Sequence, residues 1–213
     1  MTRLLVIRHG FSLSNAERRY TGQDDVGLSP LGHEQAQRVA DYLCANERVD
    51  AIFSSDLSRA MDTVRPTAKR LGLSVIPDPG LRETDVGAWT GLSYDEVNLT
   101  YAAELERHRT DPTFPCPDGE SWADVFARVT QTVLRIARQH EGQCVVIATH
   151  GGSARAIECL AAGHTVYDIA AHRTAPNASI RAYCYENGTL LSQGRNIVSH
   201  LEKPGETLPD ELV

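Results

Sequence analysis

Short apolar segments alternate with amphipathic ones along this chain of 213 residues, and this alternation constrains the fold more than any other feature. Residues 4–7, 51–53 and 144–148 have the length and apolar character of buried strands. Helical periodicity appears between them, most clearly over residues 122–137. Strands alternating with helices predict a three-layer α/β/α sandwich, in which helices cover both faces of a mainly parallel sheet.

Capping residues place several element boundaries. Ser29 and Pro30 have the residue types of an N-cap and a first helical position, so a helix is expected to begin there. Asp56 is expected to cap a second helix that runs to about Leu71. A third short strand is expected over residues 73–76.

The middle of the chain is expected to form a small cap on the sandwich. Residues 94–109 have a helical pattern, whereas residues 111–119 contain three prolines and are expected to form a loop. We expect residues 90–118 to be a cap insertion within a single domain spanning residues 1–213. Only the tail after about His200 is expected to be loosely structured.

Composition and charge exclude several functional classes. The formal net charge of −7 argues against a broad basic surface for nucleic acid. No apolar run is long enough to span a membrane, and we identify no signal peptide. The five cysteines are scattered and form no C-x-x-C pair, so neither a disulfide framework nor a zinc site is expected. These features predict a cytoplasmic protein that binds neither nucleic acid nor membranes.

Two predicted strands end in a histidine followed by a glycine. Arg8, His9 and Gly10 follow the first strand, and His150 and Gly151 follow the strand that ends at residue 148. Parallel sheets bind ligands at the carboxyl ends of their strands, and glycine lets the backbone approach a ligand closely. Taken alone, each turn is as consistent with an ordinary surface turn as with a functional site.

Further polar motifs in a fixed order favour the functional interpretation. Together with the two histidine turns, they resemble the histidine phosphatase superfamily, also called the phosphoglycerate mutase-like family. The resemblance extends from about residue 4 to residue 162, with a weaker match at residues 177–179. The additional motifs are Ser12 and Asn15, Thr21-Gly22, the segment 54–60 and Leu81-Arg82-Glu83.

The resemblance implies a role for individual residues. His9 matches the phosphate-accepting nucleophile, and Glu83 matches the proton donor. Arg8, Arg59 and His150 match the groups that surround the transferred phosphoryl. The implied assembly is a homodimer, although nothing in the sequence identifies an interface. The positions near the substrate are Ser12, Asn15, Thr21, Gly22 and Gly151.

These residue types suit phosphoryl transfer on chemical grounds as well. Arginine forks match the equatorial oxygens of the transferred group. Histidine attacks only as the neutral imidazole, and the charges of Arg8 and Arg59 disfavour protonation of His9. Glu83 would protonate the leaving alkoxide and then activate water. Because arginine and histidine supply the positive charge, this scheme requires no metal and no cofactor.

The sequence favours a phosphatase over a mutase. Residues 84–91, which follow Glu83, resemble the phosphatase branch, and neither of the two lysines falls in the predicted cap. Arg107 and Arg109 could contact a substrate carboxylate or phosphate, but they are better interpreted as a solvated helix end. We therefore predict a phosphomonoester phosphatase that acts on a small phosphorylated metabolite, and the alternative is a cofactor-dependent phosphoglycerate mutase.

Two interpretations that place the chain in another class of protein are weaker. Residues 119–123 approach the nucleophile elbow of serine esterases, but Ser121 follows a proline-rich loop and is better interpreted as the start of a helix. A module that only binds phosphate esters would be expected to lack the nucleophile or the acid, and both are present. Trp89 and Trp122 are interpreted as packing residues, although a tryptophan beside the cap could line a substrate pocket.

Overall fold

The computed structural model describes residues 1–201, so the tail expected to be loosely structured after His200 lies outside the described residues, except for Leu201. Within that part, a six-stranded sheet has the order β3-β2-β4-β1-β5-β6. The first four strands in this order run parallel, whereas β5 is antiparallel to β1 and β6 is antiparallel to β5. The strands are β1 (Thr2–Arg8), β2 (Ala51–Ser54), β3 (Val75–Pro77), β4 (Cys144–Thr149), β5 (Ile180–Glu186) and β6 (Thr189–Ser192).

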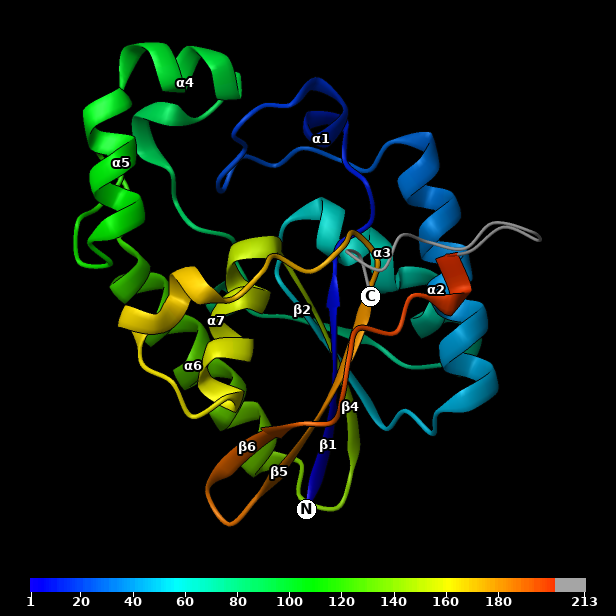
Figure 1. Ribbon diagram of the computed structural model, residues 1–213. Coiled ribbons are helices and arrows are strands. Elements are labelled where there is room, and N and C mark those ends of the chain that lie inside the picture. The colour runs from blue at the N-terminus through cyan, green and yellow to red at the C-terminus, as the bar shows by residue number, and fades with distance from the viewer. Residues whose placement is uncertain (202–213) are drawn as a thin grey trace.

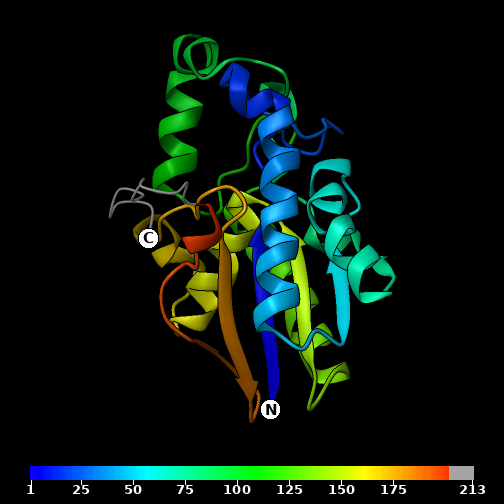
Figure 2. The ribbon, with the colours of Figure 1, turned by 90° about the vertical axis from the view of Figure 1, so that its right-hand side faces the viewer.

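Helices cover both faces of the sheet, which confirms the predicted sandwich. Helices α2 and α3 pack on one face and α6 and α7 on the other (Figures 1 and 2). Across residues 1–201, no helix has the length and apolar character needed to cross a bilayer. The helices are α1 (Leu13–Glu17), α2 (Pro30–Asn46), α3 (Ser58–Leu71), α4 (Tyr94–Thr100), α5 (Ala102–Thr110), α6 (Trp122–Gln139) and α7 (Gly151–Ala161).

The central strand β1 explains why the sheet needs both helical layers. Leu4 and Val6 belong to the apolar cluster shared with α6 and α7, whereas Leu5 and Ile7 belong to the cluster shared with α2 and α3. All four side chains are buried. A strand buried on both faces is continuously apolar, so the core extends through the sheet and fixes the position of the strand ends.

One helix start is confirmed and another is corrected. Ser29 caps α2, because its side chain accepts a hydrogen bond from the backbone N–H of Gly32 at 3.2 Å. The prediction that Asp56 caps α3 is wrong, since the N-cap residue is Leu57 and it makes no side-chain cap. The carboxylate of Asp56 instead binds the Arg82 guanidinium through two hydrogen bonds, of 2.6 and 2.7 Å. This paired, charge-assisted contact outweighs a single capping bond.

Two features of the sheet differ from the sequence prediction. The third strand, expected over residues 73–76, begins and ends later, at Val75 and Pro77. The antiparallel hairpin of β5 and β6 was not predicted. Its two-residue turn is formed by Asn187 and Gly188, with φ of 52° and 85°, as expected for a type I′ turn.

The cap stands beyond the carboxyl ends of the parallel strands (Figure 1). The helix expected over residues 94–109 is divided at Tyr101, where φ is −123°, into α4 and α5. Residues 111–119 form the predicted loop. A separate apolar cluster holds the cap together, and its buried members are Val86, Trp89, Val97, Leu105 and Cys116.

Candidate active site

The two histidine turns meet at the carboxyl edge of β1 and β4. These strands are adjacent and parallel, with Arg8 opposite Thr149. The backbone N–H of His9 donates to the carbonyl oxygen of Thr149 at 2.9 Å, and the ring centroids of His9 and His150 are 5.1 Å apart. The sheet therefore brings together two histidines that are far apart in the sequence.

The environment of His9 fixes both its tautomer and its charge. Its Nδ1 donates to the carbonyl oxygen of Gly10 at 2.7 Å, which leaves the lone pair on Nε2. Burial lowers the pKa of His9 well below 6.5, and the positive charges of Arg8 and Arg59 lower it further. The carbonyl oxygen of His9 accepts from the Asn177 side chain at 3.0 Å. The ring is thus held as a neutral imidazole whose Nε2 has no hydrogen-bond partner within residues 1–201.

Arg59 is held by all three of its guanidinium nitrogens. Nη1 and Nη2 donate to the carbonyl oxygens of Asp24 and Gly22, each at 2.7 Å, and Nε donates to His150 Nδ1 at 3.2 Å. Each Nη nitrogen keeps a second hydrogen for a ligand. Gly22 adopts a φ of 52°, which turns its carbonyl toward the arginine without steric strain.

His150 lies behind His9 and Arg59 and is completely buried. Because its Nδ1 accepts from Arg59, its Nε2 carries the hydrogen, which is donated to Ser55 Oγ at 2.8 Å. Burial lowers its pKa well below 6.5, and the charge of Arg59 adds to this effect. The ring is neutral and does not line the pocket, so it supports the site from beneath.

Arg8 has a donor that no described residue satisfies. Its Nη1 donates to the carbonyl oxygen of Ala175 at 2.6 Å, but its buried Nε has no partner among residues 1–201. A Cβ at Gly151 would lie 2.9 Å from the Thr174 side chain and 3.4 Å from this Nε. Gly151, which was expected near the substrate, is therefore placed so that it leaves room for Arg8.

The Glu83 carboxylate is held at the N-terminus of α7. The backbone N–H of Gly152 lies 3.1 Å from each of its oxygens, and the N–H of Thr84 donates to Oε1 at 2.9 Å. A Cβ at Gly152 would come within 2.5 Å of Oε1, so only glycine permits this contact. The carboxylate lines the same pocket as His9.

The remaining predicted residues reach the pocket in different ways. Ser12 and Asn15 brace their loop, because Ser12 caps α1 and its backbone N–H donates to Asn15 Oδ1 at 3.1 Å. The same oxygen accepts from Asn177 at 3.1 Å. Thr21 and Gly22 line the pocket, and Gly22 also orients Arg59. The four residues are thus brought together, two of them chiefly as a structural brace.

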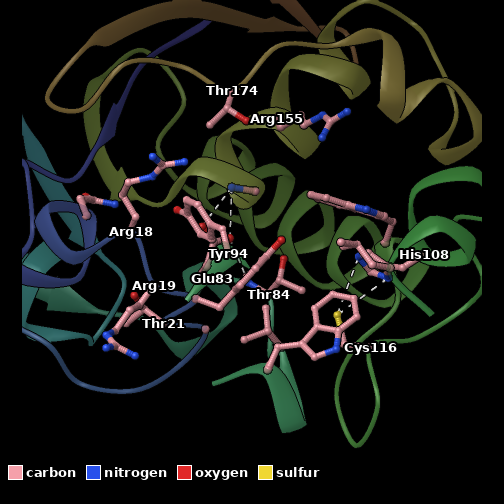
Figure 3. A pocket seen from close by; sticks show the side chains of 18 of the residues that line it. Arg18, Arg19, Thr21, Glu83, Thr84, Tyr94, His108, Cys116, Arg155 and Thr174 are labelled. Carbon is pink, nitrogen blue, oxygen red and sulfur yellow. Dashed lines mark hydrogen bonds between the residues drawn. The ribbon is translucent and has the colours of Figure 1, made fainter. Parts of the chain in front are cut away.

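The pocket has a volume of about 810 Å³, and Figure 3 shows part of its lining. Two chemically different groups of residues surround it. We use the term phosphoryl floor for Arg8, His9 and Arg59, which line the pocket, together with His150, which lies beneath them. We use the term cap-side wall for Tyr20, Tyr94, His108, Arg109, Trp122 and Arg155, all of which line the pocket.

Sequence reasoning missed most of the cap-side wall. Arg109 is exposed, as expected for a helix end, but it also lines the pocket, so its interpretation as a solvated residue was incomplete. Trp89 packs in the cap cluster as predicted, and both it and Trp122 additionally line the pocket. No local motif marks these positions, because they depend on how the cap folds over the strand ends.

A neutral histidine between two arginines can accept a phosphoryl group, which defines the class of site as one for phosphoryl transfer. Residues 4–197 match the model of the histidine phosphatase superfamily, branch 1, and the chain belongs to this superfamily. The family resemblance predicted from the sequence is therefore confirmed.

Relatives in this superfamily include phosphatases and mutase-like proteins. The chain is 38% identical over 159 residues to phosphoglycerate mutase-like protein 4 of Arabidopsis thaliana, a match that covers 72% of this chain and 68% of the relative. It is 35% identical over 165 residues to a metal-independent phosphoserine phosphatase of the same plant, covering 74% and 67%. A bifunctional protein of Mycobacterium tuberculosis is 40% identical over 149 residues, which are 70% of this chain but 41% of that protein.

The fold is also similar to solved structures. The mycobacterial glucosyl-3-phosphoglycerate phosphatase in complex with VO3 matches with a TM-score of 0.82 and 33% sequence identity. The match covers 90% of this chain and 96% of that structure. This neighbour supports the fold assignment over nearly the whole described part of the chain.

Proposed function

We propose that this protein hydrolyses phosphomonoesters of small metabolites through a covalent phosphohistidine at His9. The observation that carries the proposal is the state of His9, which is a neutral ring with a free Nε2 between Arg8 and Arg59. An uncharged imidazole is the form that can attack phosphorus. The named phosphatases among its relatives support the phosphatase prediction over the mutase alternative.

The reaction proceeds in two steps. The lone pair of His9 Nε2 attacks phosphorus, the ester P–O bond breaks, and the leaving oxygen takes a proton from Glu83. A water molecule then gives a proton to the Glu83 carboxylate and attacks the phosphohistidine. The N–P bond breaks, inorganic phosphate leaves, and His9 regains its lone pair. Glu83 is thereby protonated again for the next turnover.

The arginines stabilise the transferred group during both steps. Arg59 presents its remaining Nη hydrogens to the oxygens that carry negative charge, and Arg8 presents its Nε–H, which has no partner in the described part of the chain. His150 acts as a positioning residue, since it fixes Arg59 through Nε and packs beside the His9 ring. Preorganised donors of this kind need no rearrangement when the charge develops.

Cellular location and assembly belong to the same proposal. All five cysteines are free thiols, which supports a reducing, cytoplasmic environment. A homodimer remains a prediction, and light scattering of the purified protein would test it. The substrate is a small phosphorylated metabolite, as the pocket size and the named relatives indicate.

The decisive experiment measures phosphate release from a panel of phosphomonoesters in excess EDTA, with His9→Ala alongside. Wild-type turnover should survive EDTA. The variant should lose at least roughly 10⁴-fold in kcat, because the nucleophile itself is removed. A phosphorylated peptide containing His9 should be recovered from a rapidly quenched reaction. Isomerisation of 3-phosphoglycerate without phosphate release would instead establish the mutase alternative.

A further inference from the structure

Glu83 lies in a segment that has little regular structure of its own. We use the term acid loop for this segment, residues 80–85, which follows β3 and includes only the end of a short 3₁₀ turn. Backbone polar groups outside helices and strands need other hydrogen-bond partners. Side chains of neighbouring elements supply them here, as Thr149 on β4 does when it donates to the carbonyl oxygen of Leu81 at 2.8 Å. The shape of the acid loop therefore depends on side chains from outside it.

Arg128 on α6 holds three carbonyl groups of the acid loop. Its Nη1 donates to the carbonyl oxygens of Gly80 and Arg82 at 3.2 and 2.9 Å, and its Nη2 donates to that of Glu83 at 3.2 Å. Nε and Nη2 also donate to the two carboxylate oxygens of Glu120, at 2.9 and 2.8 Å. These contacts use all five N–H groups of the guanidinium. A guanidinium held at every donor has one orientation, so it fixes the carbonyl groups that it binds.

Glu120 holds the far end of the acid loop. Its Oε2 accepts from the backbone N–H of Asp85 at 2.8 Å, and its own N–H donates to the carbonyl oxygen of Asp85 at 2.8 Å. A Cβ at Gly119 would lie 2.4 Å from this carbonyl oxygen, so the contact needs glycine there. Ser121 caps α6 by accepting from the N–H of Asp124 at 3.2 Å. The segment that approaches an esterase motif in sequence thus begins a helix and anchors the acid loop.

The ion pair of Arg128 and Glu120 lies outside the pocket but next to its acid. The two side chains are only 23% and 21% exposed, so the pair is not an ordinary surface ion pair. Neither residue lines the pocket. The Glu83 carboxylate, which Figure 3 shows beside the Thr84 side chain, accepts from the backbone N–H groups of Thr84 and Gly152. Because Thr84 belongs to the acid loop, a shift of the loop would move both this donor and the carboxylate.

We propose that Arg128 and Glu120 are positioning residues for Glu83, which fix the acid where the leaving oxygen forms without touching the substrate. The inference rests on the proposed phosphatase function and adds the residues that set the position of its acid. Misplacement of a reacting group by about 1 Å can cost about 100-fold in rate. The loss should depend on the leaving group, because an alkoxide needs a proton to leave whereas p-nitrophenolate does not.

Arg128 has a second route to the reaction, through its charge. This charge contributes to lowering the pKa of His150, which lies in the phosphoryl floor. An effect through the floor would change the rate for every substrate alike, because the floor stabilises the transferred group. Arg128→Lys separates the two routes, since lysine keeps the charge but its single ammonium group cannot reproduce the five donors of the planar fork.

The experiment measures the rate of phosphohistidine formation in single turnovers of two esters. One is the best alkyl phosphate of the substrate panel, and the other is p-nitrophenyl phosphate. Arg128→Lys should lose about 10- to 100-fold with the alkyl ester and only a few-fold with the aryl ester. Arg135→Lys is the matched control, because Arg135 is an exposed arginine of the same helix that pairs with Asp78. It should keep the wild-type rates with both esters.

Two further variants keep the test independent of folding. Arg128→Ala should regain part of its rate with the alkyl ester when guanidinium ions are added below denaturing concentrations, but not when NaCl is added at equal ionic strength. Arg128→Leu combined with Glu120→Gln removes both charges at once, so it leaves no unpaired buried carboxylate. This double variant should show the same difference between the two esters. Thermal unfolding of each variant would show that the fold is retained.

Several outcomes would overturn the inference. Equal losses with both esters in a folded Arg128→Lys would assign Arg128 to the phosphoryl floor, and unchanged rates with the alkyl ester would leave it no part in the reaction. Failure of every Arg128 variant to fold would assign the residue to stability alone. In each of these cases the wild type still forms phosphohistidine, so the phosphatase function stands. Absence of phosphohistidine in the wild type with every ester would instead reject the proposed function.

Discussion

The phosphoryl floor and the cap-side wall of the pocket are built on different physical principles. Floor residues lie at the ends of buried strands or in the first turn of a helix, and backbone groups fix polar atoms among them, as the carbonyl oxygens of Gly22 and Asp24 fix Arg59. Wall residues come from the cap and from helix faces, and they hold each other through aromatic contacts, as Trp122 and His108 do. The floor therefore has one permitted geometry, whereas the wall can change by substitution of individual side chains.

This contrast assigns reactivity and specificity to separate parts of the molecule. Changes in the floor should affect kcat for every substrate, because they alter the stabilisation of the transferred group. Changes in the wall should affect KM and the choice of leaving group, because they alter contacts that form before the chemical step. The following three predictions test this division, beginning with the largest expected effect.

The largest effect is expected for Arg59→Ala in the floor. The substitution removes the preorganised charge beside His9 and leaves the carbonyl oxygens of Gly22 and Asp24 without their donor. We expect kcat to fall by ~100- to 1000-fold for all substrates alike. Arg70→Ala is the matched control, since Arg70 is an exposed arginine of the same helix that pairs with Asp41. Steady-state kinetics on two unlike esters would measure the effect, and near-normal turnover would contradict the role of Arg59.

The sequence predicted the floor because its signals are local. A histidine one residue beyond a short apolar run, as His9 and His150 are, is expected at a strand end, and parallel strand ends meet at one edge. The wall gave no such signal, because the pocket contacts of Arg109 and Arg155 depend on packing between distant segments. The unpredicted hairpin is different, since Asn187-Gly188 is a strong turn signal that could have revealed it.

A smaller effect is expected for Gly152→Ala, because this substitution displaces the Glu83 carboxylate and leaves the arginines of the phosphoryl floor in place. The added Cβ would lie 2.5 Å from Glu83 Oε1 and 3.0 Å from Thr84 Oγ1, so the carboxylate must move. Because a displaced acid meets the leaving oxygen at the wrong distance, we expect kcat to fall by about 10- to 100-fold. Esters with good leaving groups, such as p-nitrophenyl phosphate, should lose less in the phosphohistidine-forming step.

Gly27→Ala is the control for this glycine substitution, because a Cβ at Gly27 meets nothing within 4 Å and its φ is not positive. Burst kinetics would separate the step that forms the phosphohistidine from the step that hydrolyses it. An equal loss for good and poor leaving groups in the first step would show that Glu83 does not protonate the leaving oxygen. Gly152→Ala should keep the wild-type unfolding temperature to within a few degrees.

The third prediction compares one histidine from each region by the pH dependence of stability. His150 in the floor has a pKa well below 6.5 because of burial and the charge of Arg59, whereas burial lowers the pKa of His108 in the wall less strongly. Below pH 6.5 the unfolded chain protonates each histidine, but the folded protein keeps His150 neutral. The unfolded state then binds more protons, so the free energy of unfolding falls as the pH falls.

This linkage gives a quantitative difference between the two regions. A single histidine that stays neutral in the fold contributes a slope of about 1.4 kcal/mol per pH unit below pH 6.5 and none above it. His150→Gln should remove this slope down to the low folded pKa of His150, since glutamine can accept from Arg59 and donate to Ser55 without titrating. His108→Gln should remove it only over a narrower window just below pH 6.5. Urea unfolding between pH 5 and 8 would measure both, and equal effects would mean that the floor is no more desolvated than the wall.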